Sequence, residues 1–371
     1  MTCTMKAVYL HAAHDLRLHE EPIPALTAPD HALLRIAAVG ICGSDCHFYE
    51  RGRIGRFVVK EPLILGHECS ATVVEVGPQV QGLKPGDQVA IEPGIPCRRC
   101  RRCREGRYNL CEREVIFMAT PGLTHGAFRE YLTWPADLLY RLPQGVSLED
   151  GAMVEPLAVG IHACRRAGLA PGQSAAVIGA GPIGLLAAQA AAAYGAHPVV
   201  VTDVIAPRVE LARKLGFLAV DAAAEDPVPA IRRAAPPDGP DVIIETAGSI
   251  PTIRQAMAAV KTGGVVMLVG LPPEDEATLP LMDLLQREYD LRSVFRYANC
   301  YPPALSLIAA PRLGSGWGEA EQRRSPAGRL QLAPLRTHHF PLERTEEALQ
   351  TAISRKHEAL KVMVTLAGGA A

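Results

Sequence analysis

Short apolar runs separated by glycine and proline characterise the first half of the chain. Examples are HALLRIAAVG (31–40), ATVVEVG (71–77) and DQVAIEPG (87–94). Runs of this length, bounded by turn residues, are typical of strands. We therefore predict a compact, mainly antiparallel β domain in this half.

From about Gln173 the pattern changes to apolar strands that alternate with helical stretches. The segments, in order, are SAAVIGAG, PIGLLAAQAAAAYGA, HPVVVTD, PRVELARKLG, DVIIETAG, IPTIRQAMAAVKTGG and VVMLVGLP. Such alternation predicts βαβ units with right-handed crossovers and a parallel sheet. After about Phe295 loops, a helix and a final strand LKVMVTL (360–366) follow, which we assign to the first domain.

The predicted fold class is therefore α/β, with a doubly wound parallel sheet of the Rossmann type beside a mainly β domain. We expect the β domain at 1–155 and 297–371, and the parallel-sheet domain at 156–296. Residues 311–330 are rich in Gly, Pro and charge, which predicts a surface loop. The tail 367–371 is expected to be frayed.

Composition limits the classes of function. The 371 residues are 48% hydrophobic and 21% charged with a net charge of -1, so nucleic acid is not an expected partner. Residues 173–197 lack any charged residue, but glycines and Pro182 interrupt them, so we expect a strand, turn and helix and no membrane span. Ten cysteines without a secretion signal at the first residues favour a reducing, cytoplasmic location.

Two sets of candidate metal ligands lie within residues 42–111. The first is a closed set of cysteines with short spacings, formed by Cys97, Cys100, Cys103 and Cys111. Two-residue gaps let sulfurs converge on one zinc ion at roughly 2.3 Å, which predicts a structural site. A zinc ribbon that binds nucleic acid is the alternative, but Tyr108 is the only aromatic residue there. We interpret the six arginines of this segment as offsetting the charge of four thiolates.

The second set is open and of mixed chemistry: Cys42 in GICGSD, and His67 with Glu68 in LGHE. A further acid, Glu155, occurs in VEPLAV. Three mixed protein ligands leave one position for water or substrate, which is typical of a catalytic zinc. Whether Glu68 or Glu155 contacts the metal directly stays open at this point.

Gly179, Gly181 and Gly184 form G-x-G-x-x-G between a predicted strand and a predicted helix, a pattern that binds a dinucleotide pyrophosphate. Asp203 ends the next strand, where a carboxylate binds the adenosine ribose and favours NAD over NADP. Arg208 could accept the extra phosphate of NADP, but we interpret it as packing beside the adenosine or as a helix-surface charge.

Together these motifs resemble those of the zinc-containing medium-chain dehydrogenases, in the branch of sorbitol, xylitol and related polyol dehydrogenases. The resemblance spans nearly the whole chain and rests on GICGSDCHFYERGRIG, LILGHE, the four cysteines, VEPLAVGIHACRR, GAGPIG with Asp203, and SVFRYANCYP. It implies that the β domain is GroES-like. Glu155 stands where the alcohol dehydrogenase branch places a cysteine ligand, which favours the polyol branch.

The resemblance also implies roles for individual residues. Zinc would be held by Cys42, His67 and Glu68, with Glu155 on the metal or on its water, and Ser44 and His47 would pass the alcohol proton to solvent. Substrate would be contacted by Tyr49, Phe117, Thr120, Arg296 and Tyr297. NAD would be contacted, besides the three glycines, by Ile183, Asp203, Arg208, Val269, Gly270, Leu271 and Phe295.

The sequence thus predicts an enzyme with one catalytic and one structural Zn²⁺ that oxidises a sugar alcohol to a ketose with NAD. The alternatives are an L-threonine 3-dehydrogenase, a vicinal-diol dehydrogenase and, third, a zinc protein without enzymatic activity. For the first two, Arg296 and Tyr297 are the discriminating positions. The resemblance implies a homotetramer or dimer, and the segment 311–330 looks like an insertion relative to the family pattern.

Overall fold

The computed structural model describes residues 3–235, 237–274, 276–310 and 330–366. The expected loop at 311–330, up to residue 329, and the expected frayed tail at 367–371 lie outside these residues. The chain forms two compact units, of which unit 1 contains 3–155, 301–309 and 332–366. Unit 2 contains 156–300 with the flanking residues 310, 330 and 331. Among the described residues, no helix is long and apolar enough to cross a membrane.

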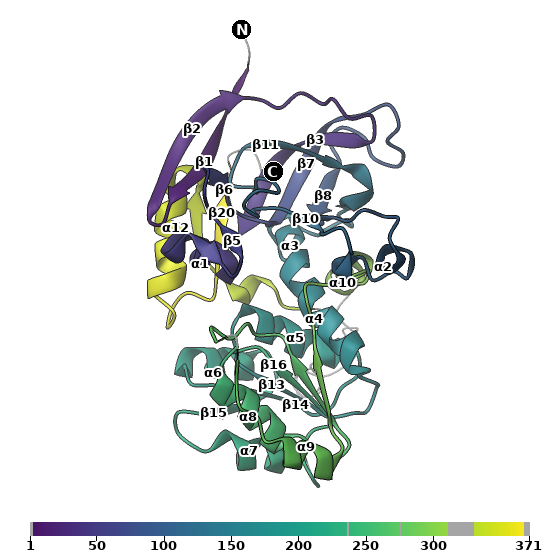
Figure 1. The fold of residues 1–371 in the computed structure, drawn as a ribbon, viewed down its shortest axis with the longest axis vertical. Helices are drawn as coiled ribbons and strands as arrows, with labels where there is room; N and C mark the ends of the chain where they lie inside the picture. The colour runs from purple at the N-terminus through teal and green to yellow at the C-terminus, as the bar shows by residue number, and fades with distance from the viewer. Residues whose placement is uncertain (1–2, 236, 275, 311–329, 367–371) are drawn as a thin grey trace. The chain divides into compact units, whose positions relative to one another are not determined.

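Unit 1 is built around a seven-stranded sheet in the order β12-β8-β7-β3-β20-β19, with β11 also paired to β3 (Figure 1). Smaller sheets join β2, β1 and β6, then β9 with β10 and β4 with β5. The strands are β1 (Thr4–Ala12), β2 (Asp15–Pro22), β3 (His31–Gly40), β4 (Arg53–Ile54), β5 (Phe57–Val58), β6 (Leu63–Ile64), β7 (Glu68–Val76), β8 (Gln88–Ile91), β9 (Gly94–Ile95), β10 (Ile116–Phe117), β11 (Tyr131–Pro135), β12 (Leu139–Arg141), β19 (Arg336–Pro341) and β20 (Lys361–Thr365).

Helices in unit 1 are short and follow the strands. They are α1 (Gly43–Arg51), α2 (Arg101–Arg104), α3 (Leu148–Ala152), α10 (Tyr301–Ala309) and α12 (Thr345–Ser354), with 3-10 turns at Tyr108–Leu110, Ala136–Leu138, Ala333–Leu335 and Leu342–Arg344. α4 (Val154–Ala167) has its first two residues in unit 1 and the rest in unit 2.

The central strand β3 brings the segments that carry the candidate metal ligands together at one end of the large sheet. Eight of its ten residues are buried, because β3 pairs with β7, β11 and β20 and lies in the middle of the sheet. Its end, Gly40, pairs with Glu68 at the start of β7 and with Met363 of β20. Three strands that are distant in sequence therefore meet where the candidate metal ligands begin.

Unit 2 contains a six-stranded parallel sheet in the order β15-β14-β13-β16-β17-β18 (Figure 1). Numbered along this unit, the order is 3-2-1-4-5-6, which is the Rossmann arrangement. The elements are β13 (Ala175–Ile178), α5 (Pro182–Ala193), β14 (Val199–Asp203), α6 (Ala206–Lys214), β15 (Leu218–Asp221), α7 (Pro227–Ala234), β16 (Val242–Glu245), α8 (Ile250–Ala259), β17 (Val265–Leu268), α9 (Leu281–Arg287) and β18 (Asp290–Ser293).

The predicted fold class is confirmed, and the strand and helix segments named from the sequence match observed elements. Sequence reasoning overlooked the pair β15 and α7, the helix α9 and the last strand β18. The uncharged stretch 173–197 forms β13 and α5 as expected, and α5 is buried from Gly184 to Ala192. Burial of the small alanine side chains against the sheet explains the lack of charge there.

Candidate functional site: two metal-ligand clusters and a dinucleotide loop

Cys42 lies at the N-cap of α1, where the chain leaves β3. The fully buried Asp45 fixes this corner, because its carboxylate accepts hydrogen bonds from the Cys42 N–H (3.0 Å) and from the Gly66 N–H (3.0 Å). Gly66 directly precedes His67, whose Nδ1 lies 3.7 Å from Asp45 Oδ1. Asp45 thus ties the segment of Cys42 to that of His67.

The open ligand set meets in space as the sequence predicts. The Cys42 sulfur, a ring nitrogen of His67 and a carboxylate oxygen of Glu68 all lie within 4.8 Å of one another. His67 and Glu68 are buried, and Cys42 is half-buried. A thiolate, an imidazole and a carboxylate at this spacing are a donor set that fits zinc, so the residues present fit the implied metal.

The charges around the open set favour a cation. Burial lowers the pKa of His67, but the charges of Cys42 and Asp45 outweigh burial and raise it to about 10. Glu155, at the start of α4 and 6% exposed, adds to this negative field. A divalent ion would offset the same negative charges.

One buried cation already lies in this field. Lys361, the first residue of β20, donates hydrogen bonds from Nζ to both carboxylate oxygens of Glu68 (2.8 and 2.6 Å) and to the Ile41 carbonyl (3.0 Å). Burial lowers the pKa of Lys361, but the charges of Glu68, Cys42 and Glu155 raise it above its ordinary value. Glu68 therefore carries an ion pair as well as being a candidate metal ligand.

The predicted proton relay residues lie on α1, three positions apart and so on one side of the helix. Ser44 is half-buried and His47 is exposed. Among the hydrogen bonds of the described residues, none joins Ser44 to His47. Burial, and next the charge of Arg51, lower the pKa of His47 below its ordinary value. The neutral imidazole that results is able to accept a proton at neutral pH.

The predicted substrate residues of unit 1 have different neighbours. The Phe117 ring lies 5.3 Å from the His67 ring, and Thr120 lines a pocket of about 660 Å³ formed with residues 56–58, 60–63 and 121–125. Tyr49 is buried, and its hydroxyl donates to Glu346 Oε1 (2.9 Å) and accepts from Gln350 Nε2 (3.2 Å), both on α12. Phe117 thus flanks a candidate metal ligand, whereas the Tyr49 hydroxyl is held by α12.

The predicted substrate residues of unit 2 follow β18. Arg296 has a positive φ of 57°, an uncommon conformation for a residue other than glycine. Its guanidinium stacks on the Phe295 ring at 4.9 Å, while Phe295 itself is 54% exposed. Tyr297 is buried.

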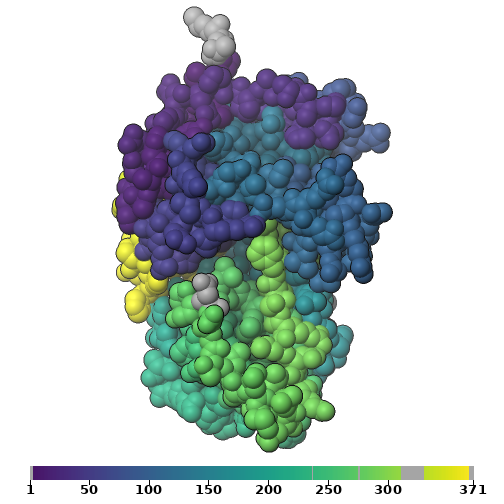
Figure 2. Space-filling model, in the orientation of Figure 1, coloured from purple at the N-terminus to yellow at the C-terminus, as the bar shows by residue number. Residues whose placement is uncertain are grey.

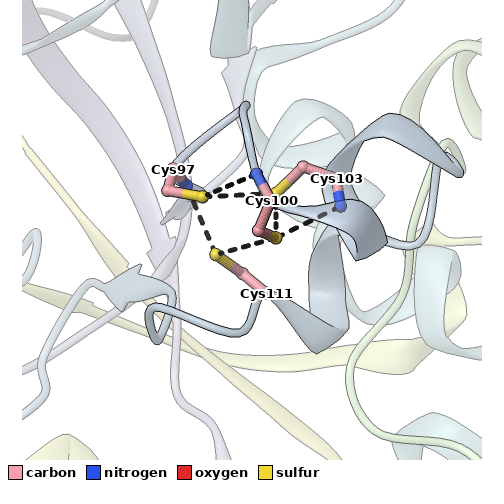
Figure 3. A group of neighbouring side chains, drawn as sticks. All are labelled: Cys97, Cys100, Cys103 and Cys111. Carbon is pink, nitrogen blue, oxygen red and sulfur yellow. Dashed lines mark hydrogen bonds between the residues drawn. The ribbon is translucent and has the colours of Figure 1, made fainter.

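The four cysteines of the closed set converge as predicted (Figure 3). The Sγ–Sγ distances are 3.4 Å for Cys100–Cys103, 3.9 Å for Cys97–Cys103 and 3.9 Å for Cys100–Cys111. Four sulfurs at about 2.3 Å from one zinc ion are separated by about 3.8 Å, so the spacing fits a closed tetrahedral site. All ten cysteines of the chain are free of disulfide bonds.

Backbone N–H groups donate hydrogen bonds to these sulfurs, and among the described residues no arginine side chain does so. The N–H groups of Cys100, Cys103 and Cys97 donate to the sulfurs of Cys97, Cys100 and Cys111 at 3.3–3.4 Å. The N–H of Arg99 is the largest influence on Cys97 and helps lower the pKa of this thiol to about 6.

Three of the six arginines pair instead with carboxylates. Arg98 binds Asp137 at 2.7 Å, and Arg101 and Arg102 bind Glu105 at 2.6 and 3.2 Å. That the six arginines offset the charge of the thiolates stays an interpretation. This part of the chain reaches the surface of unit 1, coloured blue in Figure 2.

The glycine-rich loop of unit 2 has the geometry that a pyrophosphate site requires. Gly179 has a φ of 98°, and a Cβ at Gly184 would overlap the Gly179 carbonyl oxygen, so both positions need glycine. A Cβ at Gly181 would meet only Arg208 Nη1, at 3.9 Å, which leaves space above this residue. Gly181 is the N-cap of α5 and carries no capping side chain, so the N-terminus of α5 is available to an anion.

Asp203 and Arg208 lie beside this loop. The Asp203 carboxylate accepts from the Ala180 N–H (2.7 Å) and the Ile205 N–H (2.8 Å), which fixes it at the end of β14. The Nε atom of Arg208 is buried and has no hydrogen-bond partner among the described residues. Burial lowers the pKa of Arg208, although the charge of Asp203 acts in the opposite direction. An anionic cofactor bound here would provide a hydrogen-bond acceptor for the Nε atom of Arg208.

The other predicted cofactor contacts lie near the same sheet edge. Ile183 follows Pro182 in the first turn of α5, and Val269 and Gly270 follow β17. A Cβ at Gly270 would overlap the backbone of Gly248. Leu271 is 74% exposed, unusual for so large an apolar side chain.

Sequence reasoning missed three residues of the metal site, namely Gly40, Asp45 and Lys361. Asp45 was visible in GICGSD, three residues after the cysteine. Lys361 was visible as a lone charge at the start of the apolar strand KVMVT. No pattern in the sequence indicates the role of Gly40, because that role depends on the position of Glu68 in another strand.

Comparisons with known proteins agree with this geometry. Residues 28–144 match the alcohol dehydrogenase GroES-like domain, and residues 182–310 match the zinc-binding dehydrogenase family. The chain is 42% identical to sorbitol dehydrogenase of Gallus gallus, over 96% of this chain and 95% of that protein. It is 40% identical to sorbitol dehydrogenase of Bacillus subtilis, over 97% of both.

Solved structures with the same fold cover nearly the whole chain. An Escherichia coli oxidoreductase of unknown specificity superposes with a TM-score of 0.89 at 34% identity, covering 98% of this chain and 100% of that one. A putative zinc-binding dehydrogenase of Sinorhizobium meliloti, bound to NADP, has a TM-score of 0.84 at 30% identity, with coverage of 98% and 99%. The 2R,3R-butanediol dehydrogenase of Bacillus subtilis has a TM-score of 0.83 at 31% identity, with coverage of 97% and 99%.

Proposed function

Since the chain belongs to the zinc-containing medium-chain dehydrogenase family, in its polyol branch, and is an oxidoreductase of that family, we propose that it oxidises a sugar alcohol to the ketose. The acceptor of the hydride is NAD. The cluster of Cys42, His67 and Glu68 supports this proposal most strongly, because its donor set fits an open zinc site and the chain is about 40% identical to sorbitol dehydrogenases over nearly its full length.

The residues of unit 1 have distinct tasks in this reaction. The chemistry that zinc supplies when bound is Lewis acidity, which lowers the pKa of an alcohol. Cys42 and His67, with Glu68 as the third candidate ligand, would hold the metal, and Asp45 keeps the segments of Cys42 and His67 together. Phe117 shields one side of His67 from water. Ser44 takes the alcohol proton and His47, exposed on α1, releases it to solvent.

NAD is the proposed cofactor because a carboxylate at Asp203 binds the two ribose hydroxyls and repels a 2′-phosphate. The Asp203→Ala variant is therefore expected to accept NADP better. The ratio of kcat/KM for NADP to that for NAD should rise by roughly tenfold, which corresponds to about 1.4 kcal/mol. Initial rates with both cofactors measure this ratio.

Glu210→Ala is the matched control, since Glu210 is an exposed acid on the neighbouring helix α6 that pairs only with Arg213 within the described residues. Its cofactor ratio should equal that of the wild type. A wild-type protein that already prefers NADP would overturn the assignment, and Arg208 would then be the residue to examine.

The substrate class is tested by NADH formation from xylitol, sorbitol, galactitol, L-threonine and 2,3-butanediol. We expect the polyols to give the highest kcat/KM. A preference for threonine or butanediol would favour the alternatives, of which the butanediol dehydrogenase has the support of a solved structure at 31% identity. No NADH from any alcohol would favour a zinc protein without enzymatic activity.

Further properties of the chain follow from the family as proposals. We propose a GroES-like domain at 1–155 and 297–371, an NAD-binding domain at 156–296, and a homotetramer or dimer in the cytoplasm. We expect neither nucleic acid nor a membrane among the partners. Size-exclusion chromatography with light scattering measures the oligomeric state.

A further inference from the structure

Lys361 and Glu68 form an ion pair that is buried from solvent, 293 residues apart in sequence. The exposed fractions of their side chains are 3% and 1%. An ammonium group has three hydrogens to donate, and here they go to Glu68 Oε1, Glu68 Oε2 and the Ile41 carbonyl. Lys361 is thus fully satisfied within unit 1 and holds the carboxylate by both oxygens.

A second feature makes room for this arrangement. Gly40 pairs with Glu68 in the β3–β7 ladder, and a Cβ added at Gly40 would overlap Glu68 Oε2. The carboxylate therefore lies over the bare backbone of Gly40. Gly40, the Ile41 carbonyl and Lys361 together form a cradle for Glu68, and we use that word for these three groups.

The cradle affects the metal because Glu68 is also a candidate ligand. One of its oxygens lies within 4.8 Å of the Cys42 sulfur and of a His67 ring nitrogen. A carboxylate that accepts charge-assisted hydrogen bonds from an ammonium has less electron density to donate to a metal. The cradle also gives the Glu68 carboxylate a stable position when it is not bound to the metal.

We propose that Lys361 is a positioning residue for the catalytic metal, which holds Glu68 in the cradle so that Glu68 binds zinc weakly and leaves the open position to the substrate oxygen. The inference rests on the proposed function in that it takes zinc as the resident metal. It assigns Glu68 a held position, because both of its carboxylate oxygens accept hydrogen bonds from Lys361.

The test uses two variants that empty the cradle in different ways. Lys361→Met removes the ammonium and keeps the volume, and Gly40→Ala displaces the carboxylate sterically and keeps the ammonium. In Lys361→Met the buried carboxylate is left unpaired, which is costly, and in Gly40→Ala it is displaced from the cradle, so in both variants Glu68 should turn to the metal and bind it fully. Lys361→Arg, which keeps the charge, is the conservative control.

The readout is the metal itself. Each variant is loaded with Co²⁺ in place of zinc, and its visible spectrum and its Co²⁺ affinity against a chelator are measured without substrate. A Cys42→Ser spectrum is subtracted to remove the signal of the four-cysteine site. We expect both variants to show a changed ligand field and an affinity at least equal to that of the wild type, while kcat falls by about tenfold or more and Lys361→Arg recovers the wild-type spectrum.

Two results would overturn the proposal. Wild-type spectra and affinities in both Lys361→Met and Gly40→Ala would show that Lys361 only neutralises Glu68. An affinity that falls by about tenfold or more in Lys361→Met would show that Lys361 holds Glu68 on the metal and not away from it. Because no substrate is present, this measurement decides the role of Lys361 even if the protein oxidises no polyol.

Discussion

His67→Ala is expected to reduce kcat/KM for polyol oxidation by about a thousandfold or more, which corresponds to roughly 4 kcal/mol of transition-state stabilisation. His67 is the buried imidazole of the open cluster and the residue through which Asp45 reaches the metal site. Without it, a thiolate and a carboxylate remain, which is one ligand fewer than a catalytic zinc site requires. NADH formation measures the rate, and metal analysis should show one zinc fewer per chain.

The variant should still bind NAD, because the dinucleotide loop belongs to unit 2. Titration of the protein with NADH, followed by fluorescence, tests this separately. The control is His339→Ala, which removes a surface imidazole that pairs with Glu149 at 3.3 Å and should leave the rate unchanged. A His67→Ala protein that lacks this zinc and retains the wild-type rate would refute the zinc mechanism.

Cys100→Ser is expected to have the second largest effect, on stability and not on the chemistry. Cys100 contributes to two of the three short Sγ–Sγ contacts of the closed set, and its N–H donates to the Cys97 sulfur. Loss of the ion would release the predicted structural zinc lobe, residues 93–112, because metal binding and folding of such a lobe are coupled. A loss of about 2–3 kcal/mol would lower Tm by roughly 4–12 °C.

Metal analysis and thermal unfolding measure this outcome. Cys3→Ser is the matched control, since Cys3 is an exposed cysteine outside both clusters, and both its zinc content and its Tm should equal those of the wild type. A Cys100→Ser protein that still holds two zinc ions per chain would contradict a structural role for the four-cysteine set.

The parts of the site that depend on local spacing could be predicted from the sequence. Two-residue gaps between cysteines fix where three of the four sulfurs can lie, and the structure brings all four together. The strand HALLRIAAVG corresponds to β3 at the same residues, because nearly every position in it is apolar and buried. The glycine loop could be predicted for the same reason, since strand, turn and helix follow one another directly.

The parts that depend on pairing between distant strands could not be predicted. Lys361 meets Glu68 only because β20 and β7 both flank β3, and no local pattern indicates that register. Tyr49, seven residues after Cys42, has its hydroxyl bonded to α12 near the end of the chain, a contact that no local pattern indicates. Side-chain direction at such positions is set by tertiary contacts.

The central claim is that zinc bound by unit 1 makes polyol oxidation possible. The most direct measurement is NADH formation from xylitol and sorbitol by protein depleted of metal, before and after one equivalent of Zn²⁺ per open site is restored. We predict no NADH from the depleted protein and recovery of the rate as zinc is added. Equal rates without zinc, or no NADH from any polyol after zinc is restored, would contradict the claim.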